Sequence, residues 1–106
     1  MGIDERTVRE IVRRILSVAK PDKIILFGSA VTGQMTRDSD IDLLVVEPAP
    51  GNTRHESVRL RGQLSGLGYP FDVIVISTGW FEESKDVIGG IAYPANKYGK
   101  VIYEAA

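Results

Sequence analysis

Two aspartates, Asp40 and Asp42, are separated by one residue, Ile41, and precede the apolar run Leu43–Val46. An uninterrupted apolar run of this length predicts a buried strand. Because side chains alternate across a strand, the two carboxylates are expected on the same side of the sheet. Carboxylates that close repel each other unless a cation lies between them, and a hard divalent ion shared with a substrate phosphate fits that role. For the pair alone, an acidic strand entrance exposed to water is the competing interpretation.

A second pair, Gly28 and Ser29, closes the apolar run Lys23–Phe27, which also predicts a strand. Glycine lets the backbone approach a ligand closely because it has no Cβ atom. Ser29 offers a hydroxyl and opens a short segment, Ala30–Gly33, that is expected to begin a helix. Backbone N–H groups at such a start suit the triphosphate of a nucleotide. By itself the pair also fits a tight strand-to-helix turn, and only the carboxylates downstream favour phosphate binding.

Gly28-Ser29 followed by Asp40-Ile41-Asp42 resembles the nucleotidyltransferase superfamily, which includes DNA polymerase β and the aminoglycoside nucleotidyltransferases. That superfamily takes a third carboxylate from a later strand, and Asp72 in the run Phe71–Ile76 stands in the matching place. With 106 residues, the chain is similar to the minimal nucleotidyltransferases (MNT), which keep the catalytic core and lack an additional substrate domain. The resemblance covers nearly the whole chain and implies a single domain, residues 1–106.

This resemblance implies a reaction in which a nucleoside monophosphate, AMP from ATP in the expected case, moves to a hydroxyl group. Asp40 and Asp42 would hold two Mg²⁺ ions, and Asp72 would share one of them and act as general base. Gly28 and Ser29 would bind the triphosphate.

The chain departs from the family pattern just after the serine. Members of the family often carry arginines there, where this chain has Ala30 and Thr32. The substitution removes any phosphate contact that those arginines would make. Arg37 is the nearby basic residue that would replace them in part.

The acceptor is a separate question, because a core this small has no evident acceptor pocket. Minimal nucleotidyltransferases often pair with a HEPN-domain toxin, an RNase, and can silence it by transferring AMP to a tyrosine. The resemblance therefore implies an antitoxin that works with a HEPN partner as a hetero-oligomer. Two alternatives stay open: a non-catalytic antitoxin that masks its toxin, and a small-molecule nucleotidyltransferase acting on an aminoglycoside-like acceptor.

The composition of the chain argues against several kinds of partner and cellular compartment. The net charge is −1 and no dense run of Lys and Arg occurs, which argues against broad electrostatic binding to nucleic acid. There is no cysteine, so disulfides and thiolate metal sites are excluded. The apolar runs are strand-sized, far short of a membrane helix, and no secretory signal is visible. The cytoplasm is the expected compartment.

The remaining pattern predicts an α/β (α+β) fold, a small mixed β-sheet with helices packed on one face, and the resemblance implies a palm-like arrangement. Asp4 is expected to cap the first helix, and Thr78 a short helix whose Trp80 and Phe81 are expected to pack in the core rather than stack a nucleobase. His55, the only histidine, is expected on the surface. Further expected elements are helices over Thr53–Leu67, ended by Gly68, and Ile91–Tyr98, and a last strand at Val101–Tyr103.

Overall fold

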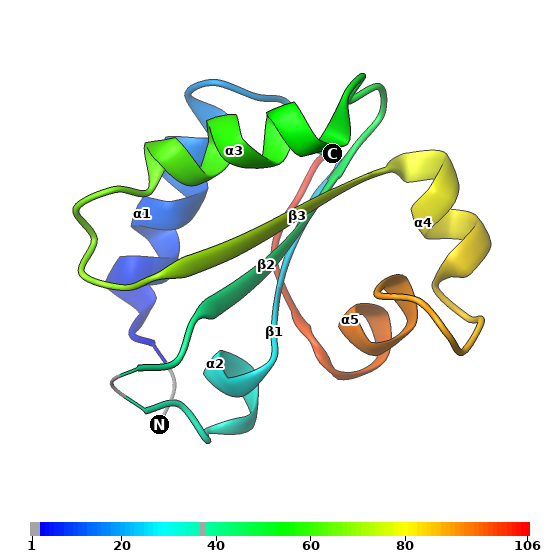
Figure 1. The fold of residues 1–106 in the computed structure, drawn as a ribbon. Coiled ribbons are helices and arrows are strands. Elements are labelled where there is room, and N and C mark those ends of the chain that lie inside the picture. Colours follow the sequence, from blue (N-terminus) through cyan, green and yellow to red (C-terminus); the bar gives the residue numbers. More distant parts are fainter. Residues whose placement is uncertain (1–2, 37) are drawn as a thin grey trace.

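The computed structural model describes residues 3–36 and 38–106, and a four-stranded sheet lies at its centre (Figure 1). Its strands run in the order β3-β2-β1-β4. The central β1 is antiparallel to both β2 and β4, whereas β2 and β3 are parallel, so the sheet is mixed. The strand bounds are β1 Lys23–Phe27, β2 Ile41–Glu47, β3 Phe71–Ser77 and β4 Lys100–Glu104. The apolar runs of the sequence therefore form the expected strands.

Strand register brings three distant segments to the same edge of the sheet. Phe27, the last residue of β1, pairs with Asp42 near the start of β2. Asp42 in turn pairs with Asp72 near the start of β3. Asp40 lies one residue before β2. The turn after β1 and the entrances of β2 and β3 are therefore neighbours, although they are far apart in the sequence.

Two longer helices, α1 (Glu5–Leu16) and α3 (Thr53–Gln63), pack on one face of the sheet. The Asp4 side chain caps α1 as expected and accepts a hydrogen bond from the Thr7 amide at 2.7 Å. The buried side chains of this face come from α1, α3 and the residue after it, three strands, and Ala30 in the turn after β1: Ile11, Ile15, Ile24, Leu26, Ala30, Ile41, Leu43, Val45, Leu60, Leu64, Phe71, Val73 and Val75.

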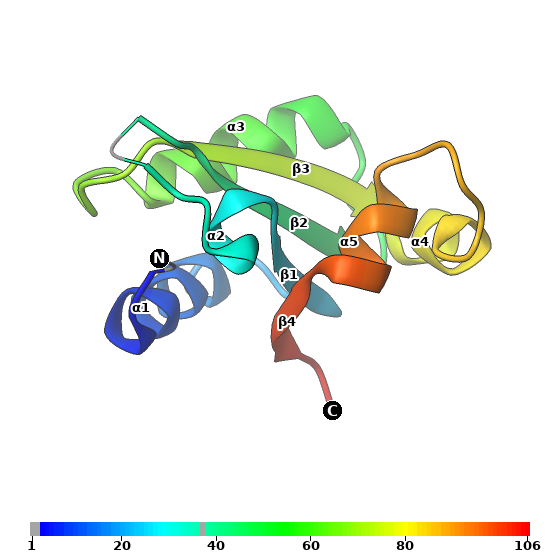
Figure 2. The same ribbon diagram turned by 90° about the horizontal axis from the view of Figure 1, so that it is seen from below.

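Helices also cover the second face, so the expectation of helices on one face holds only for α1 and α3. The short helices α4 (Thr78–Ser84) and α5 (Ala92–Tyr98) lie on the opposite side of the sheet from α1 (Figure 2). Their buried side chains form a second core with β1 and β2: Ile25, Leu44, Val46, Phe81, Ala92 and Ala95. The run Leu43–Val46 is apolar at every position because both faces of β2 are covered.

Some predicted helix details are wrong. The helix expected to reach Leu67 ends at Gln63, because Gly66 and Gly68 adopt positive φ angles of 87° and 89° that turn the chain away from helical geometry. Ser77, not Thr78, caps α4, with its side chain accepting from the Trp80 amide.

Two further side chains depart from the expectations for this region. The Thr78 hydroxyl instead donates to an Asp22 carboxylate oxygen and fastens α4 to the chain before β1. Phe81 is buried as expected, but Trp80 is 58 % exposed and lies outside the core. No helix in the described part of the chain is long and apolar enough to cross a membrane.

Candidate active site

The candidate site is the acidic edge, defined here as Asp40, Asp42 and Asp72. Asp42 and Asp72 are direct neighbours in the parallel ladder between β2 and β3. Both point to the face of the sheet that carries α4 and α5, because they alternate with buried residues of the opposite face, Leu43 and Val73. The structure therefore brings together the carboxylates that the sequence nominated.

Asp42 is the electrostatic centre of this edge. Asp40 and Asp72 are exposed to solvent, whereas Asp42 is partly buried. Burial raises the pKa of Asp42 above its usual value, and the negative charges of Asp72 and Asp40 raise it further. The three carboxylates therefore form a locus of excess negative charge that a cation would relieve.

The turn after β1 presses against this carboxylate. Gly28 has a φ angle of +73°, a conformation that favours glycine. A Cβ atom at Gly28 would overlap Oδ2 of Asp42, so any other residue here would force the aspartate side chain to shift. The position is thus constrained twice, by backbone conformation and by the close approach.

A single helical turn, α2 (Ser29–Thr32), starts directly after this glycine. The first amides of a helix have no partner inside it. In the described part of the chain, the Val31 and Thr32 amides donate to the Gly28 carbonyl, while no hydrogen bond is made by the amides of Ser29 and Ala30. These two N–H groups, with the Ser29 hydroxyl, are available to an anion beside the acidic edge.

The positions after Ser29 supply no positive charge. Ala30 is buried in the core and Thr32 is exposed, and α2 has no basic residue. Arg37, the residue that the sequence nominates as a partial replacement, lies outside the described residues. A phosphate group at this turn would therefore meet only backbone N–H groups and the hydroxyl of Ser29.

The donor set of the acidic edge suits a hard divalent cation. Three carboxylates offer only oxygen ligands, and Mg²⁺ is typically held by one or two carboxylates together with substrate phosphates. The pairing of Asp42 with Asp72 across β2 and β3 supports the fit, and the raised pKa of Asp42, caused first by burial and then by the charges of Asp72 and Asp40, agrees with it. Across residues 3–36 and 38–106, however, no group of three His, Cys, Asp or Glu side chains is gathered tightly enough to hold a metal by itself. A cation at this edge would therefore need ligands besides these carboxylates, which a substrate phosphate would supply.

Sequence reasoning missed a different acidic residue, Glu47, at the far end of β2. Its side chain is 94 % buried, and its Oε2 atom has no hydrogen-bond partner. Burial and the neighbouring Glu56 raise the pKa of Glu47 to about 7. Glu56 itself is held by Arg59, with N···O distances of 2.8 Å for both bonds. In the sequence, Glu47 is simply a charged residue at the end of an apolar run, and nothing in that pattern indicates that its side chain is buried. His55, by contrast, is exposed as expected.

Comparison with known proteins identifies the family of the chain. The model of the nucleotidyltransferase domain family matches residues 5–93, which include the whole acidic edge and the turn at Gly28. The chain belongs to the nucleotidyltransferase domain family. It is therefore a nucleotidyltransferase domain, as its motifs indicate. Among curated proteins none matches the chain at a significant level.

Solved structures of similar fold include two toxin–antitoxin structures. One, described as a toxin–antitoxin with AMP-PNP, has a TM-score of 0.69 and 23 % identity and covers 92 % of this chain and 73 % of its own. Another is a mutant of the toxin–antitoxin MntA-HpeT with two Asp-to-Glu substitutions, with a TM-score of 0.65, 20 % identity and coverage of 97 % and 75 %. A putative nucleotidyltransferase from Sulfolobus solfataricus has a TM-score of 0.53, 16 % identity and coverage of 98 % and 92 %. At these identities the likeness is one of fold.

Proposed function

We propose that this domain is an antitoxin that transfers AMP from ATP to a hydroxyl, a tyrosine of a partner HEPN toxin, in the cytoplasm. The observation that carries the proposal is the position of Asp42, which lies between two further carboxylates and against the Gly28 turn. Carboxylates for cations and free N–H groups for phosphate then share one edge of the sheet. That combination suits the transfer of a nucleotide.

The similar structures support the choice of nucleotide and partner. One of them holds AMP-PNP, an analogue of ATP, in a toxin–antitoxin. Another carries Asp-to-Glu substitutions at two aspartates separated by one residue, which is the spacing of Asp40 and Asp42 here. Both concern toxin–antitoxin proteins, which favours a protein partner for this chain.

Each residue at the edge has a distinct part in the proposed reaction. Asp40, Asp42 and Asp72 would hold Mg²⁺, which when bound would neutralise charge on the attacking and departing oxygens. The amide of Ser29 and its hydroxyl bind the triphosphate and orient its α-phosphorus. Asp72 accepts the proton of the acceptor hydroxyl as that oxygen bonds to the α-phosphorus. The bond from the α-phosphorus to the bridging oxygen breaks, and pyrophosphate leaves.

A second candidate function is masking without chemistry, in which the domain neutralises its toxin by binding alone. The observation that favours it is the missing basic side chain on α2, where Ala30 is buried and Thr32 is exposed. A third, transfer to an aminoglycoside-like small molecule, requires an acceptor cleft between two copies of the chain and ranks last.

Stoichiometry separates the first two functions. A catalyst present at a small fraction of the toxin concentration inactivates all of the toxin over time, whereas a masking protein inactivates only its own molar equivalent. The measurement is the residual RNase activity of the toxin after incubation with the domain, ATP and Mg²⁺. We expect complete loss with the wild-type domain, retained RNase activity with Asp42→Asn, and complete loss with the matched control Asp38→Asn. Inactivation that stops at one equivalent, with or without ATP, would establish masking instead.

A further inference from the structure

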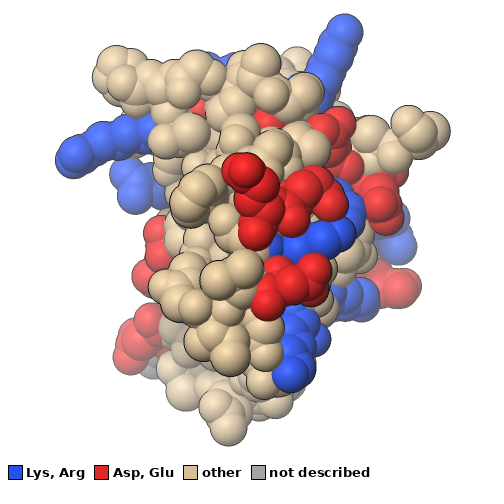
Figure 3. Space-filling view, turned by 90° about the vertical axis from the view of Figure 1, so that its right-hand side faces the viewer, with Lys and Arg blue, Asp and Glu red and all other residues tan. Residues whose placement is uncertain are grey.

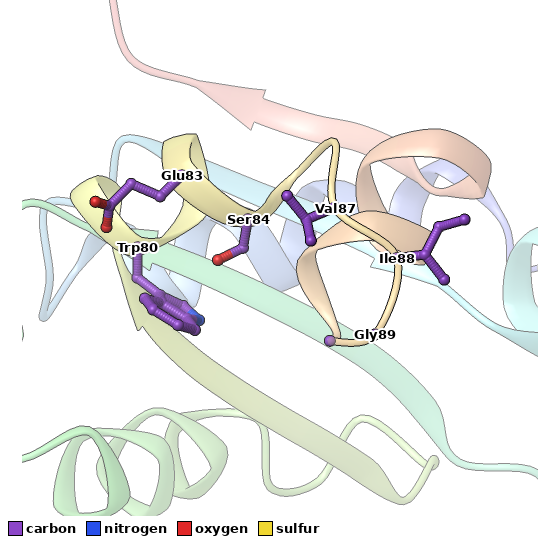
Figure 4. Close-up of a pocket in the computed structure, with 7 residues that line it drawn as sticks. Trp80, Glu83, Ser84, Val87, Ile88 and Gly89 are labelled. Carbon is purple, nitrogen blue, oxygen red and sulfur yellow. The ribbon is translucent and has the colours of Figure 1, made fainter.

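Three of the exposed large apolar side chains lie close together on α4 and on the loop that follows it. Trp80 is 58 % exposed, Val87 59 % and Ile88 80 %. Together with four neighbours they line a hollow of about 430 Å³ between α4 and the loop that leads to α5 (Figure 4). In this view Trp80 and Ser84 project from α4, and Val87, Ile88 and Gly89 lie on the loop. We call this the α4 surface: Trp80, Glu83, Ser84, Val87, Ile88, Gly89 and Gly90.

The exposed side chains of the α4 surface are not needed to hold α4 on the sheet. Phe81, the neighbour of Trp80, is 1 % exposed and anchors α4 to the second core with Ala92 and Ala95. Its burial leaves the indole of Trp80 on the outside of the helix. Exposed apolar side chains grouped around a hollow are typical of surfaces that another molecule contacts.

The indole of Trp80 also borders a second hollow of about 400 Å³. That hollow is lined by the end of β3, by the loop before α3 and by the first residue of α3: Val75, Ile76, Ser77, Pro50, Gly51 and Thr53. Trp80 therefore stands between two depressions. The two hollows can each accept an apolar side chain of a partner, with the indole of Trp80 between them.

The charge around these hollows is acidic. Residues 78–90 contain three carboxylates, on Glu82, Glu83 and Asp86, and only one basic residue, Lys85. Lys85 pairs with Glu82 at 2.8 Å, while Glu83 and Asp86 form no ion pair within the described part of the chain. Figure 3 shows acidic side chains on the face that carries α4, with basic side chains among them, beside uncharged surface. A complementary partner therefore presents apolar side chains flanked by Lys or Arg.

The α4 surface lies at the opposite end of β3 from the reaction site. Asp72 is the second residue of the seven-residue strand β3, and α4 starts directly after its last residue. At about 3.3 Å per residue, the length of the strand separates the two by roughly 20 Å. A protein bound at α4 thus leaves the acidic edge open to nucleotide and to a flexible acceptor segment.

We infer that the α4 surface docks the toxin partner, through a segment with apolar side chains flanked by Lys or Arg. The inference rests on the proposed function for the existence of that partner. It adds a docking site that is separate from the residues of the reaction. Its loss therefore raises the KM for the toxin and leaves the KM for ATP unchanged.

The test measures binding of the domain to the HEPN toxin that the proposed function assigns as its partner. We expect Val87→Glu/Ile88→Glu and Trp80→Ala each to raise Kd by roughly tenfold or more, because both variants remove apolar anchors. The matched control is Val58→Glu on α3, since Val58 is 57 % exposed and lies away from the hollow. That control is expected to change Kd by less than about twofold. Thermal unfolding midpoints show whether each variant is folded.

The charge of the site is tested separately. Glu83→Lys/Asp86→Lys is expected to weaken toxin binding by about fivefold or more in dilute buffer, and by less at high salt, where surface charges are screened. Equal binding of this variant and of the wild type at low salt would overturn the basic character assigned to the partner.

Other outcomes would overturn the docking site itself. They are toxin binding by Val87→Glu/Ile88→Glu that equals the wild type, and the absence of any complex with the toxin. A third is a self-associating domain, seen by sedimentation equilibrium, that Val87→Glu/Ile88→Glu makes monomeric without loss of toxin binding, since the surface would then belong to a second copy. The two proposals fail separately. Toxin binding that depends on the α4 surface, without AMP transfer, would overturn the reaction. AMP transfer with an unchanged KM for the toxin in Val87→Glu/Ile88→Glu and Trp80→Ala would overturn the docking site.

Discussion

Gly28 and Asp42 occupy adjoining space so closely that a Cβ atom at position 28 would overlap Oδ2 of the aspartate. The contact joins the turn that would hold phosphate to the carboxylate that would hold the cation. One substitution at Gly28 should therefore disturb both.

Gly28→Ala is expected to lower nucleotide transfer by about a hundredfold, because the methyl group displaces Asp42 and misplaces a reacting group. It also places alanine at φ +73° and ψ −148°, backbone angles that are used almost only by glycine, which costs about 1–3 kcal/mol. The matched control is Gly66→Ala: Gly66 has φ +87°, but nothing lies within 4 Å of the added Cβ. Steady-state transfer rates and urea unfolding of both variants test this. An equal loss of transfer in both would show that strain alone, not the contact with Asp42, matters.

Asp42→Asn should separate reaction from stability. The nearby charges of Asp72 and Asp40 oppose ionisation of Asp42, so the neutral amide removes a repulsion in the metal-free protein. We expect transfer to fall by at least about a hundredfold. The thermal midpoint without Mg²⁺ should equal or exceed that of the wild type, and the shift produced by adding Mg²⁺ should shrink. A wild-type response to Mg²⁺ in this variant would place the cation elsewhere.

Glu47 should make the stability of the domain depend on pH. Its pKa is raised to about 7 in the folded state, chiefly by burial, from 4.5 in an unfolded chain. Folding is therefore favoured by the protonated carboxyl, and this contribution is fully present below pH 4.5 and lost as pH rises through about 7. Glu56, whose pKa is lowered by Arg59, acts in a separate window below pH 4.5.

Glu47→Gln replaces the carboxyl with a neutral group of the same shape. At pH 8 it should raise the free energy of unfolding by about 1–3 kcal/mol. It should also flatten the decline of that free energy between pH 5 and pH 8. Urea unfolding across this range is the measurement, and Glu5→Gln, with a side chain 87 % exposed, is the control. A decline that persists in Glu47→Gln would assign the pH dependence to another group.

Arg14 links α1 to the end of α3. Its guanidinium donates to the carbonyls of Gln63 at 3.2 Å and Ser65 at 2.7 Å and also contacts Glu10 at 2.8 Å. Arg14→Ala should lower the free energy of unfolding by about 1–2 kcal/mol, since the carbonyls lose their donor. Arg9→Ala on the same helix, whose ion pair with Glu5 is 3.8 Å long and exposed, should cost less than about 0.5 kcal/mol. Equal midpoints in urea would contradict the structural role of Arg14.

The strands and the acidic edge could be predicted because their signals are local. Apolar runs define β1, β2 and β3, and the placement of Asp40, Asp42 and Asp72 at strand entrances follows from those runs. The four-residue apolar run in β2 also carried the information that both faces are covered, which the one-face expectation overlooked.

Features set by tertiary contacts could not be predicted. Trp80 and Phe81 are adjacent aromatic residues with the same local pattern, and only the direction of α4 against the sheet decides which one is buried. The burial of Glu47 depends in the same way on α3, whose residues Glu56 and Arg59 interact with Glu47 at the end of β2. This contact joins segments that are separate in the sequence, so the local pattern around Glu47 does not indicate it.

The most direct test of the central claim is the intact mass of the cognate HEPN toxin after incubation with this domain, ATP and Mg²⁺. AMP transfer predicts a mass increase of one or more AMP units on the toxin, mapped to a tyrosine. It also predicts no increase with Asp40→Asn/Asp42→Asn, and an unchanged increase with Asp38→Asn. A stable complex in which the toxin gains no mass with any nucleoside triphosphate would contradict the transfer reaction and leave a domain that neutralises its partner by masking.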